Sequence, residues 1–211
     1  MSRLARENVA YRPFEERDFD AVAGLYQTLW CAGLDERVAA RAGQLAAATY
    51  LSASSLGLVG CVGEDVLGVV LARDGFGRRA PRWEGRRKEL LAEAEGLGLA
   101  RELGSALTID RSEFSLAADY SRRGGRFSQA QMTLLAVSPE AHGLGMGSGL
   151  FDRMSSLIAR AGAPGFFLTT DDECDWGYYE HRGLSRISSH EVVADADGNV
   201  IRVYLYGCDL T

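Results

Sequence analysis

Apolar and polar residues follow two patterns along the chain, one typical of strands and one typical of helices. Short β-rich runs bounded by turn residues predict strands at residues 9–12, 56–62, 66–71, 130–137, 165–170, 187–193 and 200–206. Apolar residues at helical spacing predict helices from about residue 18 and over residues 35–51, 148–160 and 173–181. Turn residues at 63–65 and 195–199 predict that two of the strand pairs are hairpins.

Residues 74–127 interrupt this pattern. The segment mixes basic and acidic side chains, with a weak helical period over 84–103 and a second short helix over 110–120. Asp110 or Ser112 is the predicted N-cap of that second helix. We interpret residues 74–127 as a helical insertion that serves as a lid or an interface.

Together these elements predict a single α/β (α+β) domain over residues 1–211. Antiparallel strands come early and a β-α-β-α-β passage comes late, so we expect a mixed, mostly antiparallel central sheet with helices on both faces. The 211 residues, 46% hydrophobic and 25% charged, suffice to bury a core without disulfides or a structural metal.

Charge and composition narrow the range of functions. The 23 basic and 29 acidic residues give a net charge of −6, which argues against nucleic acid as a partner, because nucleic-acid binders neutralise phosphates with a basic surface. Four scattered cysteines and three histidines predict neither a disulfide framework nor a metal site. The charged start, Met1 to Glu7, and the lack of an 18-residue apolar run predict a cytoplasmic protein without a membrane partner.

A glycine-rich turn between the strand at 130–137 and the helix at 148–160 has the properties of an anion site. A helix N-terminus presents unpaired N–H groups to an anion. Gly143, Gly145 and Gly147 carry no Cβ atom that would hold a diphosphate away from the backbone.

Two common phosphate motifs do not fit this turn. A P-loop requires a lysine, and the turn has none. The dinucleotide fingerprint G-x-G-x-x-G fails because Ser148 and Leu150 stand where its third glycine is required. Asp171 stands near the position of a ribose partner, so a dinucleotide enzyme remains a weaker hypothesis.

Two motifs stand in the second half of the chain. The first is Val137-x-Pro139-Glu140-x-His142-x-x-Gly145-x-Gly147, and the second is Tyr178-Tyr179-Glu180-His181-Arg182-Gly183-Leu184. The first resembles the acetyl-CoA-binding motif of the GNAT superfamily of N-acetyltransferases, Gln/Arg-x-x-Gly-x-Gly/Ala, and the second resembles that family's Phe-Tyr-Glu-x-x-Gly-Phe. The order of predicted elements is also similar outside residues 74–127. His142 replaces the usual Gln or Arg, and Leu184 replaces the Phe.

The resemblance implies acetyl-CoA as co-substrate, with no metal. The N–H groups of residues 144–148 would hold the pyrophosphate of coenzyme A, and the strand edge at 135–137 would pair with the pantetheine. Asp172 stands at the family's usual asparagine position, seven residues before Tyr179. The cofactor-binding residues that the resemblance implies are Leu135, Ala136, Val137, His142, Gly143, Leu144, Gly145, Met146, Gly147, Ser148 and Asp172.

The resemblance also implies direct attack of an amine on the acetyl group. Tyr179 occupies the family's general-acid position, and a backbone N–H near Val137 would stabilise the oxyanion. The strand before the turn carries no carboxylate, so no general base is assigned. Asp110, Glu113 and Asp119 of the insertion stay open as alternatives.

The sequence therefore predicts an N-acyltransferase that moves an acetyl group from acetyl-CoA to a small-molecule or peptide amine. The resemblance also makes a homodimer an option. The missing carboxylate motivates an alternative, a non-catalytic acyl-CoA-binding or regulatory module of the same fold.

Overall fold

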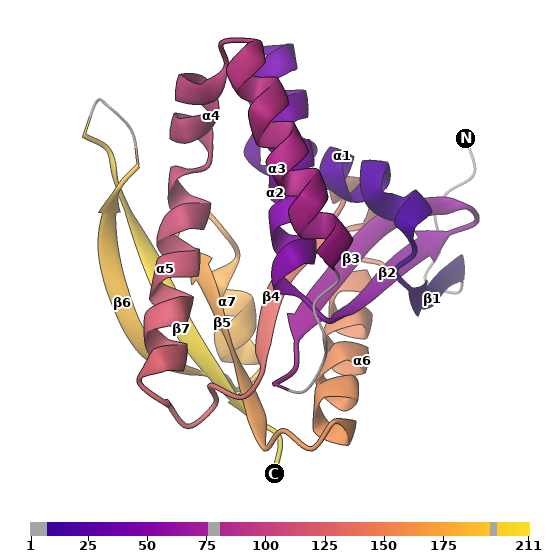
Figure 1. Cartoon of the computed structure of the whole chain (residues 1–211). Coiled ribbons are helices and arrows are strands. Elements are labelled where there is room, and N and C mark those ends of the chain that lie inside the picture. Colours follow the sequence, from indigo (N-terminus) through magenta and orange to yellow (C-terminus); the bar gives the residue numbers. More distant parts are fainter. Residues whose placement is uncertain (1–7, 76–80, 195–197) are drawn as a thin grey trace.

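The structure, a computed structural model, describes residues 8–75, 81–194 and 198–211, and its strands form one sheet (Figure 1). The strands are β1 (Val9–Pro13), β2 (Leu56–Val62), β3 (Asp65–Arg73), β4 (Gln131–Val137), β5 (Gly165–Asp171), β6 (Ser185–Val193) and β7 (Val200–Asp209). They lie in the order β1-β2-β3-β4-β5-β7-β6. All neighbours pair antiparallel except β4 and β5, which are parallel. The predicted mixed, mostly antiparallel sheet is confirmed.

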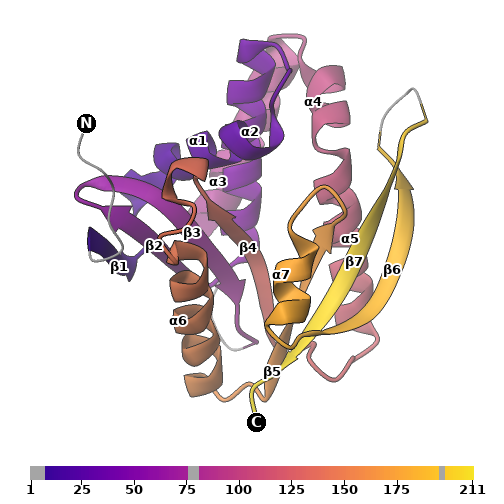
Figure 2. The ribbon, with the colours of Figure 1, turned by 180° about the vertical axis from the view of Figure 1, so that it is seen from behind.

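Helices cover both faces of the sheet, as predicted. They are α1 (Phe19–Trp30), α2 (Glu36–Ala53), α3 (Pro81–Gly96), α4 (Ala100–Ala106), α5 (Thr108–Arg122), α6 (Met146–Arg160) and α7 (Trp176–His181). On the face seen in Figure 1, α1 and α2 pack on β3 and β4, and α5 packs on β5 and β7. The opposite face carries α6 and α7 (Figure 2).

The insertion is part of this layered structure. Helices α3 and α4 pack against α2, and α5 extends the helical layer over the second half of the sheet. Trp83 and Leu103 join the same buried cluster as residues of α1 and α2, while Ala117 packs with Phe167 of β5 and Leu205 of β7. The helices of the insertion therefore connect the two halves of the fold.

Several predicted bounds were wrong. The helix expected over 84–103 breaks into α3 and α4 at Gly98, whose φ of 71° lies in the left-handed region. Neither Asp110 nor Ser112 caps α5, because the helix already begins at Thr108. The helix expected from residue 148 begins at Met146, and the one expected from residue 173 begins at Trp176. The predicted turn at 195–199 and the segment Met1 to Glu7 lie partly or wholly outside the described residues.

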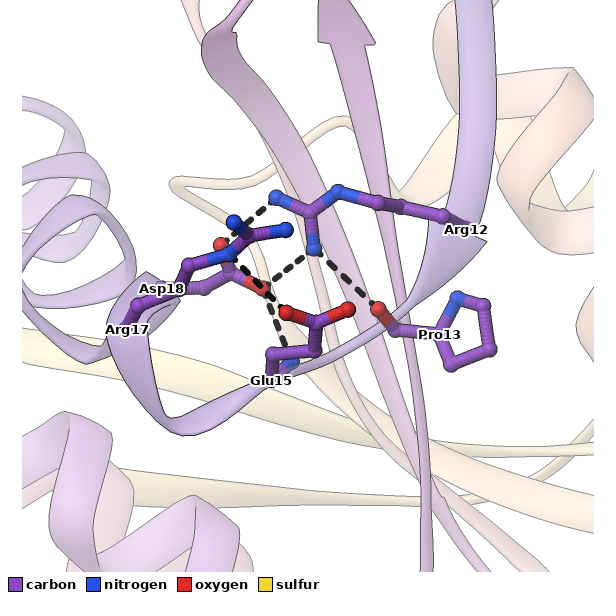
Figure 3. A network of polar contacts seen from close by, with 5 residues as sticks. All are labelled: Arg12, Pro13, Glu15, Arg17 and Asp18. Carbon is purple, nitrogen blue, oxygen red and sulfur yellow. Dashed lines mark hydrogen bonds and ion pairs between the residues drawn. The ribbon is translucent and has the colours of Figure 1, made fainter.

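An ion pair fixes the connection from β1 to α1 (Figure 3). The Arg12 guanidinium donates Nη1 to Asp18 Oδ2 at 2.6 Å and Nη2 to Asp18 Oδ1 at 2.7 Å. The Glu15 backbone N–H also donates to Asp18 Oδ2, at 2.8 Å. The Asp18 side chain is only 3% exposed, and these hydrogen bonds hold the pKa of its carboxyl below the ordinary value. The start of α1 is thereby attached to the edge of the sheet.

Candidate functional site

Strands β4 and β5 separate almost as soon as they meet. Within the described strands, Gln131 of β4 and Phe167 of β5 are the one pair of residues that lie opposite each other in the ladder. By contrast, β4 pairs with β3 from Gln131 to Val137. Both views show β4 and β5 diverging toward their carboxyl ends (Figures 1 and 2). Among the described strands, none pairs with the β5-facing edge of β4 beyond Gln131. Its N–H and C=O groups can therefore pair with an extended ligand.

The glycine-rich turn follows directly from the carboxyl end of β4. Gly145 precedes α6 with φ 74° and ψ 12°, a left-handed conformation that favours glycine. The first bond within the helix runs from the Gly149 N–H to the Gly145 carbonyl at 2.9 Å. The N–H groups of Met146, Gly147 and Ser148 precede that bond and have no acceptor within the helix. Unpaired N–H groups at a helix N-terminus are suited to bind an anion.

The Leu144 N–H is not available to an anion, contrary to the expectation for residues 144–148. It donates to the Ala141 carbonyl at 3.2 Å, because the chain folds tightly after the single turn Pro139–Ala141. The Met146 side chain is 1% exposed and packs against Gly60 and Gly68, so it faces the core and not the outer surface of the turn.

The outer surface of the turn is open. A Cβ atom added at Gly143 would meet no heavy atom within 4 Å, and one at Gly147 would meet only Val137 Cγ2, at 3.6 Å. The His142 side chain is exposed beside them. The space and the free N–H groups fit a pyrophosphate.

The remaining predicted cofactor residues lie on β4 and at the end of β5. Leu135 and Val137 are half-buried and pack on the α6 side, while Ala136 is buried on the α1 side. Asp172 is held at the pairing of β5 with β7, where its Oδ1 accepts the Arg202 N–H at 3.1 Å. Its own N–H donates to the Arg202 carbonyl at 3.0 Å.

Tyr179 lies on α7, in an aromatic group. Its ring centroid is 5.4 Å from that of Tyr178 and 6.1 Å from that of Tyr206. Burial raises the pKa of the Tyr179 phenol, and nearby Cys174 and Glu113 raise it further. The phenol is therefore protonated at neutral pH and can donate a proton.

Three acidic residues, Asp110, Glu113 and Asp171, form what we call the carboxyl cluster. Asp110 accepts the Tyr26 hydroxyl at 2.5 Å and the Tyr50 hydroxyl at 2.6 Å. Burial raises the pKa of Asp110, and these hydrogen bonds oppose that change. The pKa of Glu113 is raised well above its ordinary value, first by burial and then by the charges of Asp110 and Asp171.

Sequence reasoning left Asp110 and Glu113 among open alternatives. The helical spacing of Asp110, Glu113, Phe114 and Ala117 indicates one inward-facing side of α5 and could have singled them out. Asp119 instead forms an ion pair with Arg122, and both side chains are exposed.

Asp171 is unsuited to bind a ribose, and Cys174 is unsuited to act as a nucleophile. Asp171 is 7% exposed and accepts the N–H groups of Glu173 and Cys174 at 2.9 and 3.0 Å, so it is not presented to a ribose. Burial and Asp171 raise the pKa of the Cys174 thiol to about 12, which leaves it protonated and a poor nucleophile. The described residues include no group of three His, Cys, Asp or Glu side chains arranged to hold a metal.

Comparison of the backbone with solved structures decides the fold. A GCN5-related N-acetyltransferase from Rhodopseudomonas palustris superimposes with a TM-score of 0.56 at 15% identity, over 100% of this chain and 99% of that one. Ard1 from Thermoplasma volcanium gives 0.57 at 15% identity, over 97% and 99%. The ribosomal-protein-S18-alanine N-acetyltransferase from Escherichia coli gives 0.58 at 10% identity, over 96% and 94%. This chain has the GNAT fold.

This chain is similar to those proteins in its backbone structure and not in its sequence. The sequence matches no protein-family model and no curated protein. In this GNAT fold the glycine-rich turn follows the end of β4, while Asp171 ends β5 and Tyr179 lies on the helix after it. Ligands of open α/β sheets commonly bind outside the carboxyl ends of such strands. In the part of the chain that the structure describes, no helix is long and apolar enough to cross a membrane.

Proposed function

We propose that this protein transfers an acetyl group from acetyl-CoA to an amine. The observation that carries the proposal is the unpaired edge of β4, which leads directly to the free N–H groups at the start of α6. An extended pantetheine would pair with the edge beyond Gln131, and the N–H groups of Met146, Gly147 and Ser148 would bind the pyrophosphate. One continuous stretch of chain thus suits both parts of coenzyme A.

Tyr179 is the proposed general acid. When the amine nitrogen bonds to the acetyl carbon and the carbon–sulfur bond breaks, the leaving sulfur needs a proton. The Tyr179 phenol, which is protonated at neutral pH, supplies that proton as the thiolate forms. A backbone N–H near Val137 stabilises the oxyanion of the tetrahedral intermediate.

Glu113 is the proposed general base. An amine acceptor is protonated at neutral pH and must lose a proton before it attacks. Glu113 is close enough to raise the pKa of both Tyr179 and Cys174, and its own raised pKa makes it a stronger base than a solvated carboxylate. The alternative of a non-catalytic acyl-CoA-binding module rested on the lack of a carboxylate on the strand before the turn. A base supplied by Glu113 of α5 would remove that reason.

Titration of acetyl-CoA by calorimetry tests the binding step. We expect wild-type protein to bind acetyl-CoA and Gly147→Trp to lose at least about tenfold in affinity, because the indole would fill the space over the free N–H groups. Gly147 has an ordinary helical φ, so the substitution does not strain the backbone. Gly85→Trp, on an exposed position of α3 with no heavy atom within 4 Å of an added Cβ, is the matched control. Equal binding by the wild type and Gly147→Trp would disprove this placement.

A further inference from the structure

A cavity of about 330 Å³ lies between α2 and the three helices of the insertion. Its walls are mainly aliphatic and aromatic. Leu45 comes from α2, Leu91 from α3, Leu103 from α4, and Phe114 from α5. No local sequence pattern predicts this cavity, because each of these helices supplies only a few of the lining residues.

The cavity also has polar lining residues. Glu95 and Arg111 are exposed, Arg87 and Asp110 are half-buried, and Tyr50 is buried. Each Asp110 oxygen accepts one tyrosine hydroxyl, and a carboxylate oxygen can accept a second donor. The cavity is therefore mainly apolar along its walls and offers the half-buried Asp110 carboxylate as an acceptor.

We propose that this cavity binds the amine acceptor, and that the acceptor carries its amine on an apolar group, with the ammonium placed at Asp110. This inference rests on the proposed function, because it assigns the acceptor of that same reaction.

Charge and position favour an apolar amine over other small ligands. An anionic ligand would meet the Asp110 carboxylate, and a polyol would leave its hydroxyls unpaired against leucine and phenylalanine walls. An ammonium instead gives Asp110 a counter-charge in a desolvated site, where charge-assisted hydrogen bonds are strongest. Glu113, the proposed base, lies one helical turn away on α5 and belongs to the same carboxyl cluster.

Binding of two matched probes to the full chain without acetyl-CoA tests the proposal. The probes are 4-phenylbutylamine and its neutral analogue 4-phenylbutan-1-ol. We expect the amine to bind wild-type protein at least about tenfold more tightly than the alcohol, because only the amine gains a charged hydrogen bond. Asp110→Asn should remove that difference while leaving the affinity for the alcohol within about twofold.

A second variant tests the cavity itself. Gly104 lines the cavity, and a Cβ atom there would meet only Arg111 Nη1, at 3.9 Å. Gly104→Leu should weaken both probes at least about tenfold by occupying the space, while Gly85→Leu, on the exposed face of α3, should weaken neither. Calorimetry with acetyl-CoA on the same samples reports the proposed function separately.

The outcomes are distinct. If wild-type protein binds acetyl-CoA but neither probe, or if Gly104→Leu binds both as the wild type does, the acceptor cavity is disproved and the proposed function stands. Equal affinity for the amine and the alcohol would overturn the assignment of the ammonium to Asp110. If the protein binds the probes but does not bind acetyl-CoA, the proposed function is contradicted. The ligand of the cavity is then not the acceptor of an acetyl transfer.

Discussion

Tyr178 and Tyr179 are adjacent, yet their environments give them different expected roles. The Tyr179 phenol has its pKa raised by burial and by nearby Cys174 and Glu113. Tyr178 packs its ring edge-to-face on Phe151 at 6.0 Å, and its buried hydroxyl has no hydrogen-bond partner among the described residues. A pairwise comparison of the two residues therefore separates catalysis from packing.

We expect Tyr179→Phe to lower kcat about 100-fold with little change in affinity for acetyl-CoA, since the variant keeps the ring and loses the proton donor. Tyr178→Phe should leave kcat unchanged and should not destabilise the fold, because it removes a buried hydroxyl that lacks a partner. Steady-state kinetics and thermal unfolding of both variants are the measurements. Equal loss of kcat in the two variants would exclude Tyr179 as the specific acid.

Glu113 has a pH-dependent role if it is the base. It accepts a proton only when ionised, and burial and neighbouring carboxylates raise its pKa above the ordinary value near 4.3. The rate of acetyl transfer should therefore rise with pH through the raised pKa of Glu113. Glu113→Gln should lower kcat and abolish that rise, measured as a pH–rate profile. Asp119→Asn, on an exposed part of α5, is the control and should keep the wild-type pH–rate profile. If the rate of Glu113→Gln still rises with pH in the same way, another group is the base.

At the scale of elements, the contact between α1 and α2 depends on one glycine. A Cβ atom at Gly43 of α2 would lie 2.4 Å from the Ala23 carbonyl oxygen of α1, so the two backbones could not keep their spacing. Gly24 of α1 has no heavy atom within 4 Å of an added Cβ. These two helical glycines are a matched pair, one required by packing and one not.

We expect Gly43→Ala to lower the free energy of unfolding by about 1–3 kcal/mol, through displacement of α1 from α2. Gly24→Ala should raise it by about 0.5–1 kcal/mol, because alanine is the better helix former. Urea denaturation of both variants measures the difference. If both substitutions are stabilising, the helices can separate freely and the close contact has no energetic consequence.

Local sequence patterns could predict most helices and strands. They could not predict the features that depend on contacts between residues far apart in the sequence. The strands and the first two helices carry clear periodicity, so their existence followed from sequence. Asp110 looked like an N-cap because aspartate commonly caps helices, but Tyr26 and Tyr50, 84 and 60 residues away in sequence, hold its carboxylate. No local pattern could reveal those partners, and the proposed base and the cavity depend on the same long-range packing.

At the scale of the whole molecule, the ion pair at the sheet edge makes stability depend on pH. The Arg12 guanidinium and the Glu15 N–H stabilise the charged form of Asp18, so the pKa of Asp18 is lower in the folded protein than in the unfolded chain. That contribution is fully present above the unfolded value near 3.9 and is lost as the pH falls through the lower folded value.

We therefore expect Asp18→Asn to destabilise the protein by about 1–3 kcal/mol at pH 7 and by much less once the pH falls below the lowered pKa of Asp18. Chemical denaturation at several pH values measures this. Asp20→Asn, an acidic residue two positions along in α1 and away from the Arg12 pair, is the control and should cost little at any pH. If Asp18→Asn lowers the free energy of unfolding by the same amount at every pH, then the packing of this side chain, and not its charge, stabilises the protein.

The near-absence of pairing between β4 and β5 also has a consequence for motion. The sheet consists of two antiparallel ladders, β1 to β4 and β5 with β7 and β6, joined by a single pair of register partners. Separating the two ladders would break very few hydrogen bonds between strands. The free-energy cost of separation therefore comes mainly from the loss of contacts made by the helices that pack across the two ladders. The two ladders can therefore behave as separate cooperative units, and the side chains of α5 and α6 set how tightly their fluctuations are coupled.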